Sequence, residues 1–188
     1  MLSYRETAHG VKALYEDGHL IEFAVFDPEE LRVARVNRYR VLLDRADIER
    51  RLSSVAAETA ANPEGGAGDA WLMGQLLTSL LTGTARFARG ELLSGRAVVE
   101  TQAVRFLLIL LARHGPSDRR GLLDGLDPFR RFERVHPELA REIGSLLRLE
   151  IPAAALGLLD LSRRELANRM PDFPARAADV VARRISGA

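Results

Sequence analysis

The strongest constraint on the fold is the hairpin pattern of residues 15–26. Asp17-Gly18 stands between two runs rich in apolar residues, and such a dipeptide is a turn signal for two antiparallel strands. In the second run Ile21, Phe23 and Val25 alternate with the remaining residues, so the two sets lie on opposite faces of a strand. We predict a hairpin formed by residues 11–16 and 19–26, with the Ile/Phe/Val face in a core.

Glu22 lies on the other face of this predicted strand, between Leu20 and Ala24. A carboxylate among apolar neighbours has two interpretations. It could be an edge charge that discourages pairing with another sheet, or it could be a ligand for a cation. The strand pattern leaves both open.

The next segment predicts a short helix, a third strand and a longer helix. Asp27-Pro28 suits a helix start, with Asp as the cap and Pro in the first turn, so residues 28–35 are predicted as helical. Residues 38–43 are predicted as the third strand, and apolar spacing predicts a helix over residues 46–60. Residues 1–61 therefore form a predicted α/β domain with an antiparallel or mixed three-stranded sheet.

The run from Asn62 to Gly68 is rich in Pro and Gly and predicts a linker. Beyond it the pattern is helical throughout, which predicts a helical bundle domain over residues 69–188. The first helix starts at Asp69, and a second is broken at His114-Gly115-Pro116. The predicted helices after the first cover residues 91–113, 128–135, 137–148, 152–168 and 174–185. The predicted fold class is α+β, a three-stranded sheet followed by a mainly α helical bundle.

Composition limits the classes of function. Of 188 residues 47% are hydrophobic, which is enough for a packed core, and Cys is absent, which excludes disulfides and thiolate metal sites. The formal net charge of +1 gives no electrostatic argument for a nucleic-acid or membrane surface. The apolar run 104–112 is too short to span a bilayer. We expect a cytoplasmic protein without nucleic-acid or membrane partners.

Several motifs, taken in order, resemble the nucleotidyltransferase superfamily, and most of all its aminoglycoside- and streptomycin-adenylyltransferase-like group. They are Tyr15-Glu16-Asp17-Gly18, the strand 20–26, Arg40-Val41-Leu42-Leu43-Asp44-Arg45 and Arg89-Gly90-Glu91-Leu92. The resemblance covers nearly the whole chain. It implies transfer of a nucleoside monophosphate from an NTP to a hydroxyl of a small-molecule acceptor such as an aminoglycoside, with Mg²⁺. By position, Glu22 resembles the third metal-binding carboxylate of that family.

The chain departs from the family before the hairpin. There the family has a Gly-Ser loop and an Asp-x-Asp or Asp-x-Glu pair, and residues 1–10 contain neither. One carboxylate cannot hold two divalent ions against their hydration. We therefore expect a truncated or degenerate nucleotidyltransferase-like sheet, in a chain that does not transfer nucleotides alone. Whether it is an enzyme stays open.

The predicted bundle holds four further candidates. Glu91 and Glu100 are candidate general bases for the acceptor hydroxyl; the alternatives are a helix-start acid and a solvated or Arg-paired face. Arg86 and Arg89 are candidate ligands of the nucleotide phosphates, because guanidinium groups match phosphate geometry. Their alternative is a solvated face with Glu partners.

Two other functions stay open. A non-catalytic helical module would bind a ligand or dimerise, and its incomplete sheet would leave an edge or face that needs cover, most simply in a homodimer. The third is a HEPN-like ribonuclease, since Arg131 and His136 fit an Arg-x4-His pattern in which the His could act in acid/base cleavage.

Overall fold

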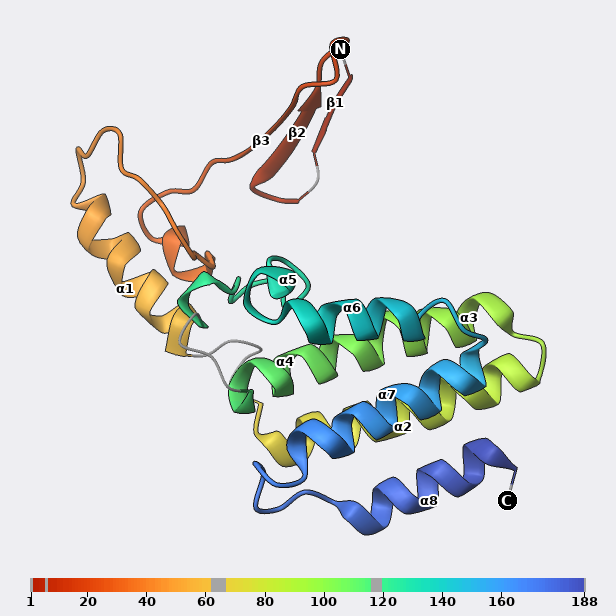
Figure 1. Cartoon of the computed structure of the whole chain (residues 1–188). Coiled ribbons are helices and arrows are strands. Elements are labelled where there is room, and N and C mark those ends of the chain that lie inside the picture. The colour runs from red at the N-terminus through yellow and green to blue at the C-terminus, as the bar shows by residue number, and fades with distance from the viewer. Residues whose placement is uncertain (1, 6, 62–66, 116–119, 188) are drawn as a thin grey trace. The chain divides into compact units, whose positions relative to one another are not determined.

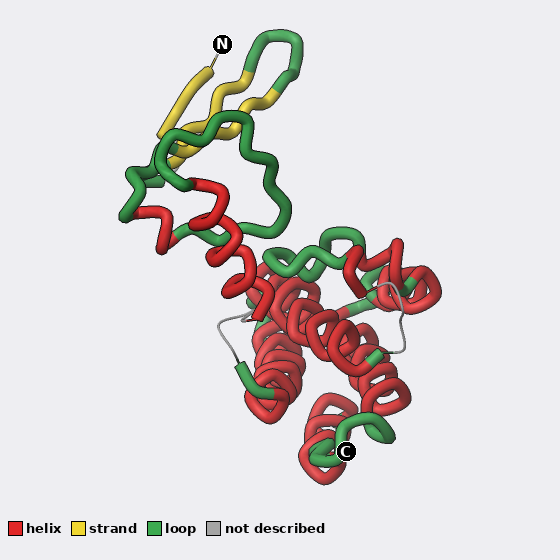
Figure 2. Tube along the Cα trace, turned by 90° about the vertical axis from the view of Figure 1, so that its left-hand side faces the viewer, coloured by secondary structure: helices red, strands yellow, loops and turns green. Residues whose placement is uncertain are grey.

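The computed structural model describes residues 2–5, 7–61, 67–115 and 120–187. The chain forms two compact units, Met1–Asn62 and Pro63–Ala188. The first holds a three-stranded antiparallel sheet, and the second is helical (Figure 2). The predicted α+β class is confirmed. Residues 62–66 of the predicted linker lie outside the described residues.

The sheet consists of β1 (Leu2–Arg5), β2 (Gly10–Leu14) and β3 (Leu20–Ala24), in the order β1-β2-β3 (Figure 1). The predicted turn closes β2 onto β3: the Gly18 N–H donates to the Tyr15 carbonyl at 3.0 Å, and the Tyr15 N–H to the His19 carbonyl at 2.9 Å. Gly18 has a φ of 85°, which glycine adopts without strain. The hairpin prediction is confirmed.

The third strand was predicted in the wrong place. Residues 38–43 are irregular, and the strand that completes the sheet is β1, which pairs with β2 from Leu2↔Leu14 to Arg5↔Val11. Alternation within 38–43 is a local property, whereas a strand needs a neighbour with free backbone groups. Leu42 and Leu43 are accordingly exposed.

The predicted first helix shrinks to a 3-10 turn, η1 (Glu30–Val33). Asp27 caps it as expected, because its Oδ1 accepts from the N–H groups of Glu29 and Glu30, both at 2.8 Å. The turn ends at Ala34, whose ψ of 151° is extended. The predicted longer helix is present as α1 (Ile48–Ala61).

Asp44 fixes the start of α1. Its carboxylate accepts from the N–H groups of Ile48 at 2.9 Å and Glu49 at 3.0 Å. These bonds, that from Glu49 first, hold the pKa of Asp44 below its usual range. Loop and helix therefore meet in a defined geometry.

The helical unit begins with α2 (Asp69–Ala88), which packs against most of the elements that follow (Figure 1). Next comes one continuous helical stretch that contains α3 (Leu92–Arg96), the π-helical segment η3 (Ala97–Ala103) and α4 (Val104–His114). The predicted break after residue 113 is confirmed. The remaining elements are η4 (Arg120–Leu122), α5 (Phe132–Val135), α6 (Pro137–Leu146), α7 (Ile151–Leu166) and α8 (Ala175–Ser186).

Helix α5 is shorter than the predicted 128–135. Arg131 adopts a left-handed backbone with a φ of 67°, so a helix cannot run through it. The turn before it is held by Asp127, whose side chain accepts from the Phe129 N–H at 3.0 Å.

One hydrophobic core holds the helical unit together. Fully buried leucines recur at helical spacing on α2 and meet others on α4 and α7. Each buried side chain of this size typically contributes about 1.5–3 kcal/mol. The largest fully buried members are Leu72, Met73, Leu76, Leu80, Leu107, Leu110, Leu111, Ile151, Leu158, Leu159, Leu161 and Leu166.

Two glycines bring α2 and α3 together. A Cβ at Gly95 would lie 2.8 Å from the Gly83 carbonyl oxygen and 2.8 Å from the Phe87 Cβ, and one at Gly83 would lie 2.5 Å from the Val99 Cγ2. Only residues without a side chain allow this approach. The contact fixes how the side chains at the ends of α2 and α3 face one another.

Candidate functional site

Glu22 faces a lysine. In the register of the sheet it lies directly opposite Lys12, and the Lys12 Nζ is 3.2 Å from the Glu22 Oε1. The Glu22 side chain is 57% exposed. A cross-strand pair of opposite charges stabilises an antiparallel sheet modestly. The cation that Glu22 contacts is therefore an ammonium group of its own sheet.

Metal ions need several ligands at one place. Within the described residues, no group of three or more His, Asp or Glu side chains could hold a metal ion. Magnesium bound through carboxylates requires near-octahedral oxygen coordination. Glu22 therefore has no ready-made metal cluster around it in that part of the chain.

Two of the four bundle candidates pair with each other at the turn between α2 and α3. The guanidinium of Arg89 places Nε at 3.0 Å and Nη2 at 2.9 Å from the Glu91 Oε1. Glu91 immediately precedes α3, where a helix N-terminus favours negative charge. To act as a base, the Glu91 carboxylate would have to give up this ion pair.

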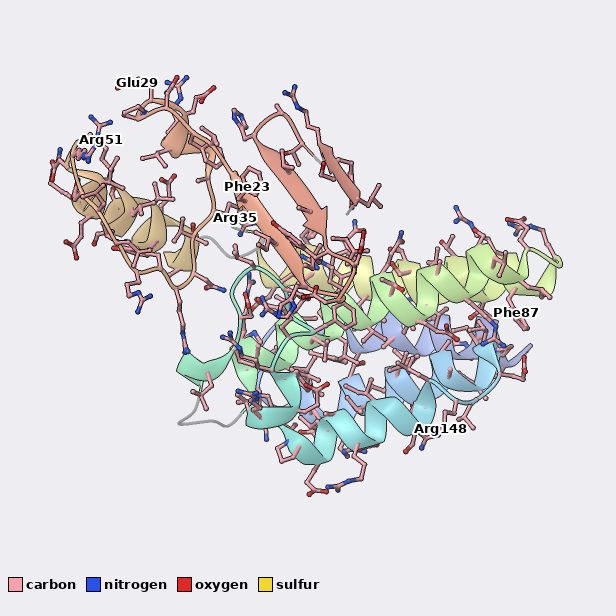
Figure 3. The ribbon with its side chains drawn as sticks, turned by 90° about the horizontal axis from the view of Figure 1, so that it is seen from above. Phe23, Glu29, Arg35, Arg51, Phe87 and Arg148 are labelled. Carbon is pink, nitrogen blue, oxygen red and sulfur yellow. The ribbon has the colours of Figure 1, made fainter. Side chains whose placement is uncertain are left out.

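Glu100 lies on the π-helical segment η3 and pairs with Arg96 at 2.8 Å. The same guanidinium is 3.7 Å from the Glu150 Oε2 and 5.6 Å from the centroid of the Phe87 ring, which Figure 3 labels. Such a cation–π contact adds to the ion pairs. Arg96 thus ties Glu100 to the end of α2 and to the residue before α7.

The remaining candidate, Arg86, donates from Nη1 to the Ser94 Oγ at 2.9 Å. Arg86, Arg89, Glu91 and Ser94 therefore all belong to contacts that fasten the α2–α3 turn. Glu100 pairs with Arg96, whereas Glu91 pairs with Arg89. The arrangement favours a structural role for these residues.

Sequence reasoning missed Glu150 and the contact between Arg96 and Phe87. The spacing of Arg96 and Glu100, four residues apart on a helix, was a usable signal for one contact. The approach of Glu150 follows from packing and has no local signal.

The two residues of the Arg-x4-His pattern lie at opposite ends of α5. His136 is buried, and its ring lies 5.0 Å from the Phe132 ring, centroid to centroid. A general base must reach the proton it abstracts. Arg131 occupies the left-handed turn that ends before α5.

The sheet exposes apolar side chains on both faces. Leu2, Leu14 and Leu20 oppose one another across the three strands, on the face of Glu22, and are 60%, 43% and 54% exposed. On the other face Ile21 and Phe23 are also exposed, and Figure 3 labels Phe23. The predicted core face is therefore wrong, because no further layer covers these side chains within the described part of the unit.

Comparison of the chain with protein-family models, curated proteins and solved structures found no match in any of the three. Among the described helices, none combines the length and the apolar character that crossing a membrane requires.

Proposed function

We propose that the chain is a non-catalytic interaction module whose N-terminal sheet binds a second copy of the same chain. The observation that carries this proposal is the row Leu2, Leu14 and Leu20, exposed on a sheet whose only buried apolar side chain among those described is Ala13. A small sheet that exposes its apolar residues gains little stability alone, and contiguous apolar patches mark interaction sites.

The charged side chains beside this leucine row favour a second copy of the chain over a partner whose surface carries only positive or only negative charge. Tyr4, Lys12 and Glu22 oppose one another across the three strands, and the Lys12 and Glu22 side chains form an ion pair. In a two-fold interface the same patch faces itself, so a patch with one positive and one negative group can place each against the opposite group of its partner. The formal net charge of +1 adds almost no repulsion between two copies.

The backbone supports the same proposal. β3 is an edge strand of the order β1-β2-β3, and an edge strand presents backbone groups without ladder partners. The described part of β3 has no Pro, and its single charge already pairs with Lys12.

Sedimentation velocity over a roughly hundredfold range of protein concentration tests self-association. We expect the wild-type mass to rise toward that of a dimer, and Leu20→Lys to shift the midpoint to at least roughly tenfold higher concentration, because a charge would be buried. The matched control is Leu93→Lys in the helical unit, where the leucine is 86% exposed; it should behave like wild type. A wild-type chain that stays monomeric, or a Leu20→Lys chain that associates normally, contradicts the proposal.

Nucleotidyl transfer is kept as a second proposal because of one observation. The Glu22 carboxylate is more than half exposed on its strand, at the position that the family resemblance gives to a metal ligand. If this proposal holds, ATP or GTP raises the melting temperature only with Mg²⁺, and Glu22→Gln abolishes the rise. No Mg²⁺-dependent rise in the wild type rejects it.

A further inference from the structure

We propose that a pocket between η1 and α1 binds a small anion through phosphate or carboxylate oxygens. The pocket has a volume of about 400 Å³, within the range of small-molecule sites. Its polar lining comes from Arg32 on η1, from Arg50, Arg51 and Ser54 on α1, and from Glu29 and Glu58. The site lies within one unit and does not depend on self-association.

The local fold explains why these groups converge. Arg51, Ser54, Val55 and Glu58 follow the spacing of one helix face, so that face of α1 lines the pocket. The Arg51 Nη1 donates to the Pro28 carbonyl at 3.1 Å, which joins the helix to the loop before η1. Both segments are capped by aspartates, so the walls of the pocket are held by hydrogen bonds.

The donors of Arg51 are not saturated. The nearest carboxylate, Glu29, lies 3.7 Å away, beyond hydrogen-bond distance, and Figure 3 shows the two residues side by side. Among the described residues, the Arg51 Nε is buried without a hydrogen-bond partner. An unpaired buried donor is destabilising and calls for an explanation. An anion beside the guanidinium would offset this cost by its charge.

One arginine of the pocket lining has no carboxylate partner among the described residues. Arg50 is engaged by Asp47, while Arg32 has no ion pair with any described side chain. Arg32 and Arg51 thus face the pocket as fork-shaped donors, which match phosphate and carboxylate geometry, and Ser54 adds a hydroxyl. Because Glu29 and Glu58 also line it, the pocket suits a small anion and not a polyanion.

Isothermal titration with inorganic phosphate and with malonate, against chloride at equal ionic strength, tests the site. We expect saturable binding of at least one anion, and the stronger one identifies the oxygen chemistry. Arg32→Gln should weaken it by roughly tenfold or more, since one charge-assisted fork is lost. The control, Arg35→Gln, changes an exposed arginine outside the lining and should bind like wild type.

Circular dichroism would first establish that both variants are folded, which is expected because Arg32 is exposed. Absence of saturable binding by either anion in the wild type overturns the proposal. So does equal binding by wild type and Arg32→Gln, since the anion would then bind elsewhere. Loss of binding in both variants also overturns it, because the effect would follow net charge alone.

Discussion

Rows of leucine occur in both units of the chain, but one row is buried and the other is exposed to solvent. Leu72, Leu76 and Leu80 on α2 are fully buried, whereas the row Leu2, Leu14 and Leu20 on the sheet is exposed. The residue type is the same, and the difference is the number of packed layers. The helices of the second unit enclose one another, while the described part of the first unit offers the sheet no cover. The helical unit carries its own core, whereas the apolar side chains of the sheet are exposed.

The largest predicted change in the free energy of unfolding comes from a substitution in the helical core, and it tests the difference between buried and exposed leucines. Leu76→Ala should lower the free energy of unfolding by about 2–5 kcal/mol, because it removes a fully buried side chain and leaves a cavity. Urea unfolding followed by the fluorescence of Trp71, the only tryptophan, reports it. The control Leu93→Ala should stay within about 0.5 kcal/mol of wild type. Equal effects of the two variants would contradict a core built on α2.

The glycine contact gives the next largest effect. Gly95→Ala should cost about 1–3 kcal/mol, since its Cβ would overlap the Gly83 carbonyl and Phe87 and force α2 and α3 apart. Gly74→Ala is the control on α2, where nothing lies within 4 Å, and it should stabilise the protein by about 0.5–1 kcal/mol. Thermal unfolding should show a lower melting temperature than wild type for Gly95→Ala and a higher one for Gly74→Ala. A stabilising Gly95→Ala would mean that the helices are not in close contact there.

A third prediction concerns pH. Burial raises the pKa of Asp69, but hydrogen bonds from Arg113 at 3.0 Å and His114 at 2.7 Å, with their charges, lower it further, so the net direction is down. A lowered pKa contributes stability above the unfolded value of about 3.9, and this is lost as pH falls through the folded pKa. The carboxylate is more than a third exposed, which limits the contribution to about 1 kcal/mol.

The variant Asp69→Asn tests this pH dependence. Urea unfolding should find wild type more stable than the variant near pH 7, and the difference should shrink as pH falls below about 4. A difference that stays constant across this range would show that Asp69 acts through packing or backbone contacts instead of charge.

The smallest effect is expected from a surface ion pair. Arg164 on α7 binds Glu142 on α6 through two hydrogen bonds, at 3.0 and 2.7 Å. The bond from Arg164 keeps the pKa of Glu142 below its usual range. Because both groups are exposed, a double-mutant cycle with Arg164→Met and Glu142→Gln should give a coupling of at most about 1 kcal/mol. A markedly larger coupling would show that surface charges, besides the core, hold the helices together.

The sequence predicted those structural features that depend on residues close together in the chain. Asp17-Gly18 specified the hairpin turn, and apolar spacing specified α1, because turn chemistry and periodicity act within a few residues. Pairing at a distance was not predictable: the strand β1 was missed, and residues 38–43 were given its place. The candidate site shows the same division. Period-two alternation placed Glu22 on its face, but its partner Lys12 follows from register, and the burial of that face depends on layers that alternation does not report.

The most direct test of the central claim is hydrogen–deuterium exchange at low and high protein concentration. If the sheet binds a second copy, amides of β3 should exchange more slowly at high concentration, while those of α2 should exchange at the same rate at both. Identical rates for β3 at both concentrations, in a chain that is otherwise folded, would contradict self-association through the sheet.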